Sequence, residues 1–206
     1  RDVFSFSDSE SNFSTRTAWG NATTSLRWNH LFNDKLFMNT SLIFSEYIFE
    51  GLKDKVHIWC TINEPAVYTT QGYFNGVFPP GKQNPELAGN VMKNLLLAHT
   101  SVYKKLKNHE DGKNHQIGIV KNIFPFDPYN RWNPLDWFVS RTLDGVFNQG
   151  ALDYFRTGEF QFSMPGMDKV TIKNSEGIGA LDFIGLNNYS HQRVKSQLNI
   201  NNFFRF

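Results

Sequence analysis

Trp59-Cys60-Thr61-Ile62-Asn63-Glu64-Pro65 closes a run in which apolar and polar residues alternate from Val56 onward. An alternation with a period of two residues predicts a β-strand over residues 56–62. Pro65 cannot donate to a sheet ladder, so we expect the strand to stop before it. The carboxylate of Glu64 then lies where the strand ends. An ordinary exposed carboxylate is the plainer interpretation, because an Asn-Glu-Pro tripeptide alone is a weak signal.

The residues around this strand form a more specific pattern. They are Tyr47, Phe49, Lys55-Val56, Trp59-x-Thr61-x-Asn63-Glu64-Pro65, Gly72-Tyr73, Gly76 and Pro79-Pro80-Gly81. This pattern resembles family 1 of the retaining glycoside hydrolases, which includes β-glucosidases, β-galactosidases and 6-phospho-β-glycosidases on a (β/α)8 barrel. Catalytic groups of such barrels lie at the C-terminal ends of the strands, so the resemblance implies a functional position for Glu64.

A second segment, Leu181-Asp182-Phe183-Ile184-Gly185-Leu186-Asn187-Asn188-Tyr189-Ser190, is similar to the sixth strand of the same family. The family motif is usually D-F-(I/L)-G-(L/I)-N-Y-Y-(T/S), and Asn188 replaces its first tyrosine. The resemblance covers roughly residues 36–195. A full barrel typically needs about 250 residues, whereas this chain has 206. The expected fold class is therefore α/β, an incomplete TIM (β/α)8 barrel that covers roughly strands 4 to 6 with their helices.

Periodicity and turn residues predict helices over residues 39–52, 85–106, 134–148 and 151–157, and loops over 66–85 and 166–180. Strands are expected over residues 116–122 and 182–187, which resemble the fifth and sixth strands of the family. Residues 1–35 are rich in Ser, Thr, Asn and Asp and predict a poorly structured N-terminal segment, and residues 191–206 predict an irregular tail. We find no repeat and no linker, so residues 1–206 are expected to form a single partial β/α-barrel domain.

The resemblance also implies roles for individual residues. Retaining glycoside hydrolysis needs two carboxyl groups about 5–5.5 Å apart, one acting as acid/base and the other as nucleophile. The resemblance makes Glu64 the acid/base and Asn63 the residue that hydrogen-bonds the sugar 2-hydroxyl. It makes Asn187 a pocket residue and Tyr189 the phenol that orients the nucleophile. Strand-end capping and packing are the alternative roles for Asn187 and Tyr189. This chemistry uses no metal ion and no cofactor, and none is expected.

The expected nucleophile is absent from the sequence. In the family it is the glutamate of a Thr-Glu-Asn-Gly segment on the seventh strand, and no such segment occurs here. Glu176, in Ser175-Glu176-Gly177, precedes the sixth strand and lacks a strand pattern. The tryptophan-rich segment of the eighth strand is also absent. We therefore expect a fragment of a retaining β-glycosidase that is inactive alone. The alternative is a truncated, non-catalytic relative that binds glycan or a protein partner.

Charge and composition limit the partners. The chain carries 21 basic and 19 acidic residues without a polybasic run, so nothing favours nucleic acid or an anionic membrane. No apolar run approaches the roughly 18 residues of a membrane span. The expected partner is a β-linked glycoside, while its sugar and aglycone and the oligomeric state stay open. A cytoplasmic location is slightly favoured because no secretory signal or disulfide is seen, although a fragment can lack its signal.

Three other residues have chemistry that the sequence leaves unassigned. Cys60 is the single cysteine, and we expect it to pack within its strand rather than react. His30 is expected at the surface. His99 falls on the predicted helix 85–106 and is expected to be structural.

Overall fold

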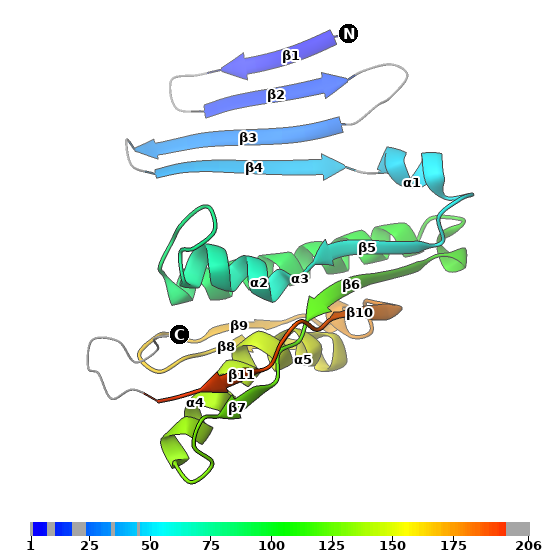
Figure 1. Cartoon of the computed structure of the whole chain (residues 1–206). Helices are drawn as coiled ribbons and strands as arrows, with labels where there is room; N and C mark the ends of the chain where they lie inside the picture. Colours follow the sequence, from blue (N-terminus) through cyan, green and yellow to red (C-terminus); the bar gives the residue numbers. More distant parts are fainter. Residues whose placement is uncertain (1, 8–10, 18–23, 34–35, 45, 197–206) are drawn as a thin grey trace. The chain divides into compact units, whose positions relative to one another are not determined.

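The computed structural model describes residues 2–7, 11–17, 24–33, 36–44 and 46–196, and their side chains from Ile48 onward (Figure 1). The chain divides into two compact units, Arg1–His57 and Ile58–Phe206. The single domain expected over residues 1–206 stays a prediction.

The first unit contains an antiparallel sheet in the order β1-β2-β3-β4. Its elements are β1 (Asp2–Ser7), β2 (Ser11–Thr17), β3 (Thr24–Asn33), β4 (Leu36–Phe44) and the helix α1 (Glu46–Leu52). The prediction of irregular chain over residues 1–35 is wrong for the three strands within that range. The predicted helix over residues 39–52 is also wrong in its first half, because residues 36–44 pair with β3. That pairing joins consecutive strands in a hairpin and overrides a helical pattern that Leu42 and Ile43 share with a strand.

The second unit is organised around a parallel sheet in the order β10-β6-β5. Its strands are β5 (Ile58–Asn63), β6 (Gln116–Asn122) and β10 (Phe183–Asn187), which confirms the three predicted strands to within two residues. Asn187 is in register with Asn122, and Asn63 is in register with Val120 after an irregularity in β5. Because the strands are parallel, their C-terminal ends meet at one edge of the sheet.

Helices follow the strands in sequence. They are α2 (Pro65–Thr69), the π-helical turn η1 (Thr70–Phe74), α3 (Pro85–Lys107), α4 (Pro134–Asp144), the π-helical turn η3 (Gly145–Gln149) and α5 (Gly150–Thr157). The predicted starts of α3 and α4 are confirmed. Asn84 caps α3 by accepting from the Leu87 amide at 2.9 Å, and Asn133 caps α4 by accepting from the Leu135 amide at 3.0 Å. Gly158, at φ 76°, ends α5. Figure 1 shows α3 alongside β5.

The predicted loop over residues 66–85 is wrong in its first half, because residues 66–74 are helical. Pro65 occupies the first helical position, where its missing N–H costs nothing. The hydroxyl of Thr69 donates to the Pro65 carbonyl at 3.0 Å, and that of Thr70 donates to the Ala66 carbonyl at 2.7 Å. The loop that was predicted from glycine and proline residues begins only after residue 74.

Short strands and turns complete the unit. They are β7 (Phe126–Pro128), β8 (Glu159–Phe162), β9 (Val170–Lys173), β11 (Gln192–Val194) and the 3-10 turns η2 (Gly112–Asn114) and η4 (Ser175–Gly177). β8 pairs with β9 in antiparallel fashion, so the predicted loop over residues 166–180 is wrong at residues 170–173. β11 pairs with β7 in parallel, so the predicted tail over residues 191–206 is ordered at its start. Residues 197–206 lie outside the described residues.

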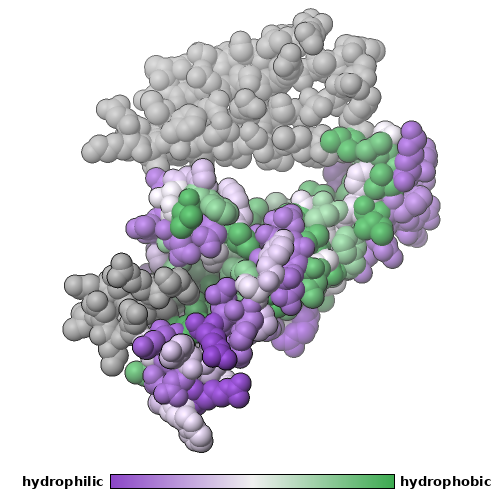
Figure 2. Space-filling view, in the orientation of Figure 1, coloured by the Kyte–Doolittle hydropathy of each residue, from purple (hydrophilic) through white to green (hydrophobic). Residues whose placement is uncertain are grey.

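The core lies between the sheet and the helices of the second unit. Fully or nearly fully buried apolar side chains include Met92, Leu96, Ile117, Ile119, Tyr154 and Phe160. On β10, by contrast, Ile184 is 39% exposed and Leu186 is 60% exposed. Figure 2 shows apolar residues (green) at the surface among polar ones. Parallel sheets normally bury both faces, so the described residues form part of a larger layered fold.

Candidate active site

Glu64 directly follows the end of β5, as predicted, and precedes the start of α2. Its amide donates to the Val120 carbonyl on β6 at 2.7 Å, and its carbonyl accepts from the Tyr68 amide at 3.1 Å. Its backbone is left-handed, with φ 49° and ψ 56°. Among the residues that the structure describes, it is the one non-glycine residue with positive φ. Such strain costs of order 1–3 kcal/mol and concentrates at functional sites.

The four residues assigned from the two motifs come together at the C-terminal edge of the sheet. The side-chain amide of Asn187 donates to Glu64 Oε1 at 2.6 Å and lies 3.4 Å from Asn63 Oδ1. The Glu64 carboxylate raises the pKa of Tyr189, chiefly by hydrogen bonding to the phenol, with smaller effects of desolvation and charge. Asn187 and Glu64 are half-buried, whereas Tyr189 is 69% exposed. A half-buried carboxyl group thus accepts a hydrogen bond from a neutral amide and lies beside the Tyr189 phenol.

Asn122 is a polar residue at this edge that the motifs did not identify. It ends β6, opposite Asn187, and is only 2% exposed. The amide of the next residue, Ile123, donates to the Asn187 carbonyl at 3.1 Å. Asn122 Oδ1 is buried and has no hydrogen-bond partner among the described residues. The one feature of the sequence that could have identified Asn122 as a site residue was its position at the end of the predicted strand 116–122.

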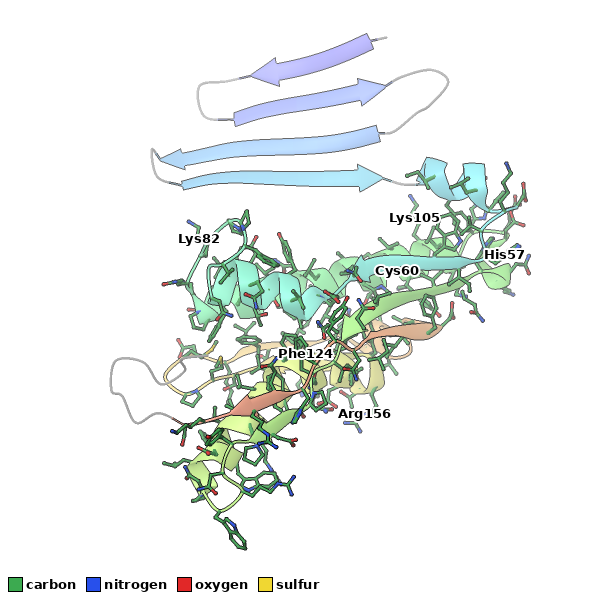
Figure 3. All side chains as sticks on the ribbon, viewed as in Figure 1. His57, Cys60, Lys82, Lys105, Phe124 and Arg156 are labelled. Atoms are coloured by element: carbon green, nitrogen blue, oxygen red, sulfur yellow. The ribbon has the colours of Figure 1, made fainter. Side chains whose placement is uncertain are left out.

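The structure places the remaining candidate residues outside the site or changes their role. Cys60 is exposed on β5 (Figure 3), so the expectation that it packs is wrong; among the described strands, β5 has a neighbour on one side only. Glu176 lies in η4, and its carboxylate pairs with Lys104 at the surface. The side chain of His30 is outside the described part.

His99 is structural, as expected from its helix. Its ring nitrogens lie 2.5 Å from Thr61 Oγ1 and 2.5 Å from the Ala180 carbonyl, and the residue is 1% exposed. These contacts connect α3 to β5 and to the segment before β10. Burial lowers the pKa of His99, and the hydrogen bond with Ala180 opposes this only in part.

The lowered pKa of His99 predicts a pH dependence of stability. Because the unfolded chain takes up this proton at a higher pH than the folded chain, the free energy of unfolding should fall as the pH drops below about 6.5. One proton contributes at most about 1.4 kcal/mol per pH unit. Urea unfolding between pH 7.5 and about 5 checks this, and His99→Gln should reduce the slope. Parallel curves for the two proteins would contradict it.

Metal-binding groups are few in the part of the chain that the structure describes. One group of three, His109, Glu110 and Asp111, has ligand atoms within 4.8 Å of one another. It lies in the turn before β6, at the opposite end of that strand from Glu64, and the Asp111 amide already donates to His109 Nδ1 at 3.2 Å. Among the described helices, none is long and apolar enough to cross a membrane.

The profile of the family described as glycosyl hydrolase family 1 matches residues 27–204. The chain belongs to this family. Beta-glucosidase A of Acetivibrio thermocellus is 30% identical over 164 residues, which cover 74% of this chain and 35% of that protein. The peroxisomal beta-glucosidase 26 of Arabidopsis thaliana is 30% identical over 179 residues, which cover 74% of this chain and 30% of that protein. This family 1 chain thus spans about a third of the length of these relatives.

Solved structures agree with this assignment. The beta-glucosidase of Trichoderma harzianum matches with a TM-score of 0.64 at 29% identity, over 75% of this chain and 34% of that one. The beta-glycosidase of Pyrococcus horikoshii matches with a TM-score of 0.63 at 31% identity, over 77% of this chain and 34% of that one. The α/β fold predicted from the motifs is confirmed, and the chain represents part of the TIM barrel of this family.

Proposed function

We propose that this chain is the part of a retaining β-glycosidase that carries the general acid/base, and that Glu64 is that residue. The observation that carries the proposal is the 2.6 Å hydrogen bond from Asn187 to Glu64, between residues 123 positions apart in the sequence. The Tyr189 phenol on the same carboxylate supports it. The named relatives are β-glucosidases, which makes a β-glucoside the first substrate class to test.

In the proposed mechanism Glu64 gives its proton to the leaving glycosidic oxygen and later takes one from the attacking water. The bond from Asn187 holds the carboxyl group in one orientation for both steps, and Tyr189, whose phenol interacts with the same carboxylate, would orient the nucleophile. Asn63, exposed beside it, would hydrogen-bond the sugar 2-hydroxyl. The attacking carboxylate would come from a part of the protein that this sequence does not contain, because it holds no Thr-Glu-Asn-Gly segment.

The proposed strand range explains the uncovered apolar residues of the sheet. If β5, β6 and β10 are the fourth, fifth and sixth barrel strands, then β10 would pair with a seventh strand and be covered by a further helix. The exposure of Ile184 and Leu186 on β10 supports this arrangement. The candidate nucleophile would then arrive next to Asn187 and Tyr189.

The test compares this chain with a polypeptide that supplies the remaining strands. We expect no turnover of an aryl β-glucoside by residues 1–206 alone, and turnover by the longer polypeptide. Turnover by residues 1–206 alone would refute the proposal that the nucleophile lies outside this sequence. Glycan binding without turnover by the longer polypeptide would favour the non-catalytic alternative.

A further inference from the structure

A groove of about 850 Å³ lies in the second unit, between the continuous helical run α4–η3–α5 and the hairpin formed by β8 and β9. Figure 1 shows β8 and β9 beside α5. Small-molecule sites usually measure about 300–1,000 Å³. The groove therefore has room for a ligand of more than one ring.

One wall of the groove is a single face of the helical run. The lining residues of this face include Thr142, Gly145, Gln149, Asp153 and Arg156. They follow one another at intervals of three or four positions, which is the spacing of neighbours on one helix surface. Gly145 leaves the middle of the wall open, because a Cβ added there would meet no atom within 4 Å. The wall thus combines free space with polar side chains on either side of it.

The opposite wall is the outer face of the hairpin. Gln161 on β8 is in register with Thr171 on β9, so their side chains lie on the same face. The alternate residues Phe160 and Phe162 are each 1% exposed and belong to the core. The side chains of Gln161, Ser163 and Thr171 line the groove and have no hydrogen-bond partner among the described residues. Their hydroxyl and amide groups are therefore available to a ligand as donors and as acceptors.

Charges along the groove are largely compensated within it. Asp153 Oδ1 accepts from the Arg156 guanidinium at 2.7 Å, and Glu159 Oε1 accepts from the Lys173 ammonium at 2.7 Å. Among the described lining residues, the one charged side chain outside these two pairs is Arg141. Because four of the five charges are paired, the groove offers little net charge to attract an ion. An uncharged polar ligand suits it better.

We infer that this groove binds a neutral oligosaccharide, at a place separate from the candidate active site. Each sugar hydroxyl both donates and accepts hydrogen bonds, as the hydroxyl and amide side chains of the two walls do. Val146 and Ile172, which are partly buried in the lining, offer apolar surface to the C–H face of a sugar ring. The inference does not rest on the proposed glycosidase activity, because none of the four site residues lines the groove.

The test measures the binding of cellotetraose, an uncharged β-linked glucan, to the whole chain by isothermal titration calorimetry. Gln161→Ala with Thr171→Ala removes two hydrogen-bonding side chains of the hairpin wall and should weaken binding about tenfold. Gly145→Tyr places a ring in the open part of the helical wall and should weaken binding at least as much. Sodium chloride at about 0.5 M should leave the affinity of the unmodified chain unchanged, because salt screens charges and the ligand has none.

The matched control is Gln116→Ala with Ser101→Ala, which removes two exposed polar side chains outside the lining. It should leave the affinity unchanged, and far-UV circular dichroism verifies the folding of every variant. Absence of binding to the unmodified chain would overturn the inference, as would equal affinities of the unmodified chain and the groove variants. If Glu64→Gln weakens binding and the groove variants do not, the sugar binds at the candidate active site. That outcome would overturn the inference and support the proposed function.

Discussion

Replacing Glu64 by glutamine in the complete glycosidase should lower kcat/KM for a β-glucoside with a poor leaving group by about 10²–10⁴-fold. Glutamine keeps the shape of the side chain, and its oxygen can still accept from the Asn187 amide, which now lies 2.6 Å from Glu64 Oε1. It cannot donate an acidic proton to the leaving oxygen. The fall in kcat/KM therefore reports the loss of the acid and not a change of fold. Steady-state kinetics measures kcat/KM.

The choice of substrate separates the two roles of Glu64. An aryl glucoside with an activated leaving group does not need the acid in the first step, so its glycosyl-enzyme should form and then persist. Azide needs no general base, and we expect it to restore turnover on that substrate as a glycosyl azide. Glu176→Gln is the matched control, because Glu176 lies in η4 and pairs with Lys104 at the surface. Unaffected turnover in Glu64→Gln would remove this residue from the mechanism.

The sequence predicted the parts of the site that depend on local pattern. Alternation predicted the strand before Glu64, the family motif predicted the strand that ends at Asn187, and the parallel register brings their ends together across 123 residues. The start of α3 was predicted from Pro85, and the structure adds the cap at Asn84. These elements share one property: local propensity and tertiary pairing favour the same structure.

Other features could not be predicted because pairing between strands decides them. Residues 39–44 fit a helical pattern, but their backbone groups pair with β3. The left-handed backbone of Glu64 occurs where its amide donates a hydrogen bond to the Val120 carbonyl on the neighbouring strand. The buried Asn122 has no motif of its own, and its importance depends on β10 lying beside it. In each case the missing information is which strand is the neighbour.

Because β6 and β10 lie close together, a substitution at Gly118 on β6 should cause a large loss of stability. Gly118 is in register with Phe183, and a Cβ added at Gly118 would lie 2.2 Å from the Phe183 carbonyl oxygen and 2.8 Å from its ring. Backbone atoms of a paired strand cannot yield as a flexible side chain can. Gly118→Ala should therefore lower the free energy of unfolding by about 3 kcal/mol or more, as expected for severe overpacking, and urea unfolding measures it.

Gly145→Ala is the control for this substitution, because its added Cβ would meet no atom within 4 Å and its φ of −57° is helical. Alanine there should leave stability unchanged or raise it by up to about 1 kcal/mol. If Gly118→Ala is tolerated as well as Gly145→Ala, β10 does not lie this close to β6. The 2.6 Å contact between Asn187 and Glu64 would then lose its support, since β6 is the strand that joins β10 to β5.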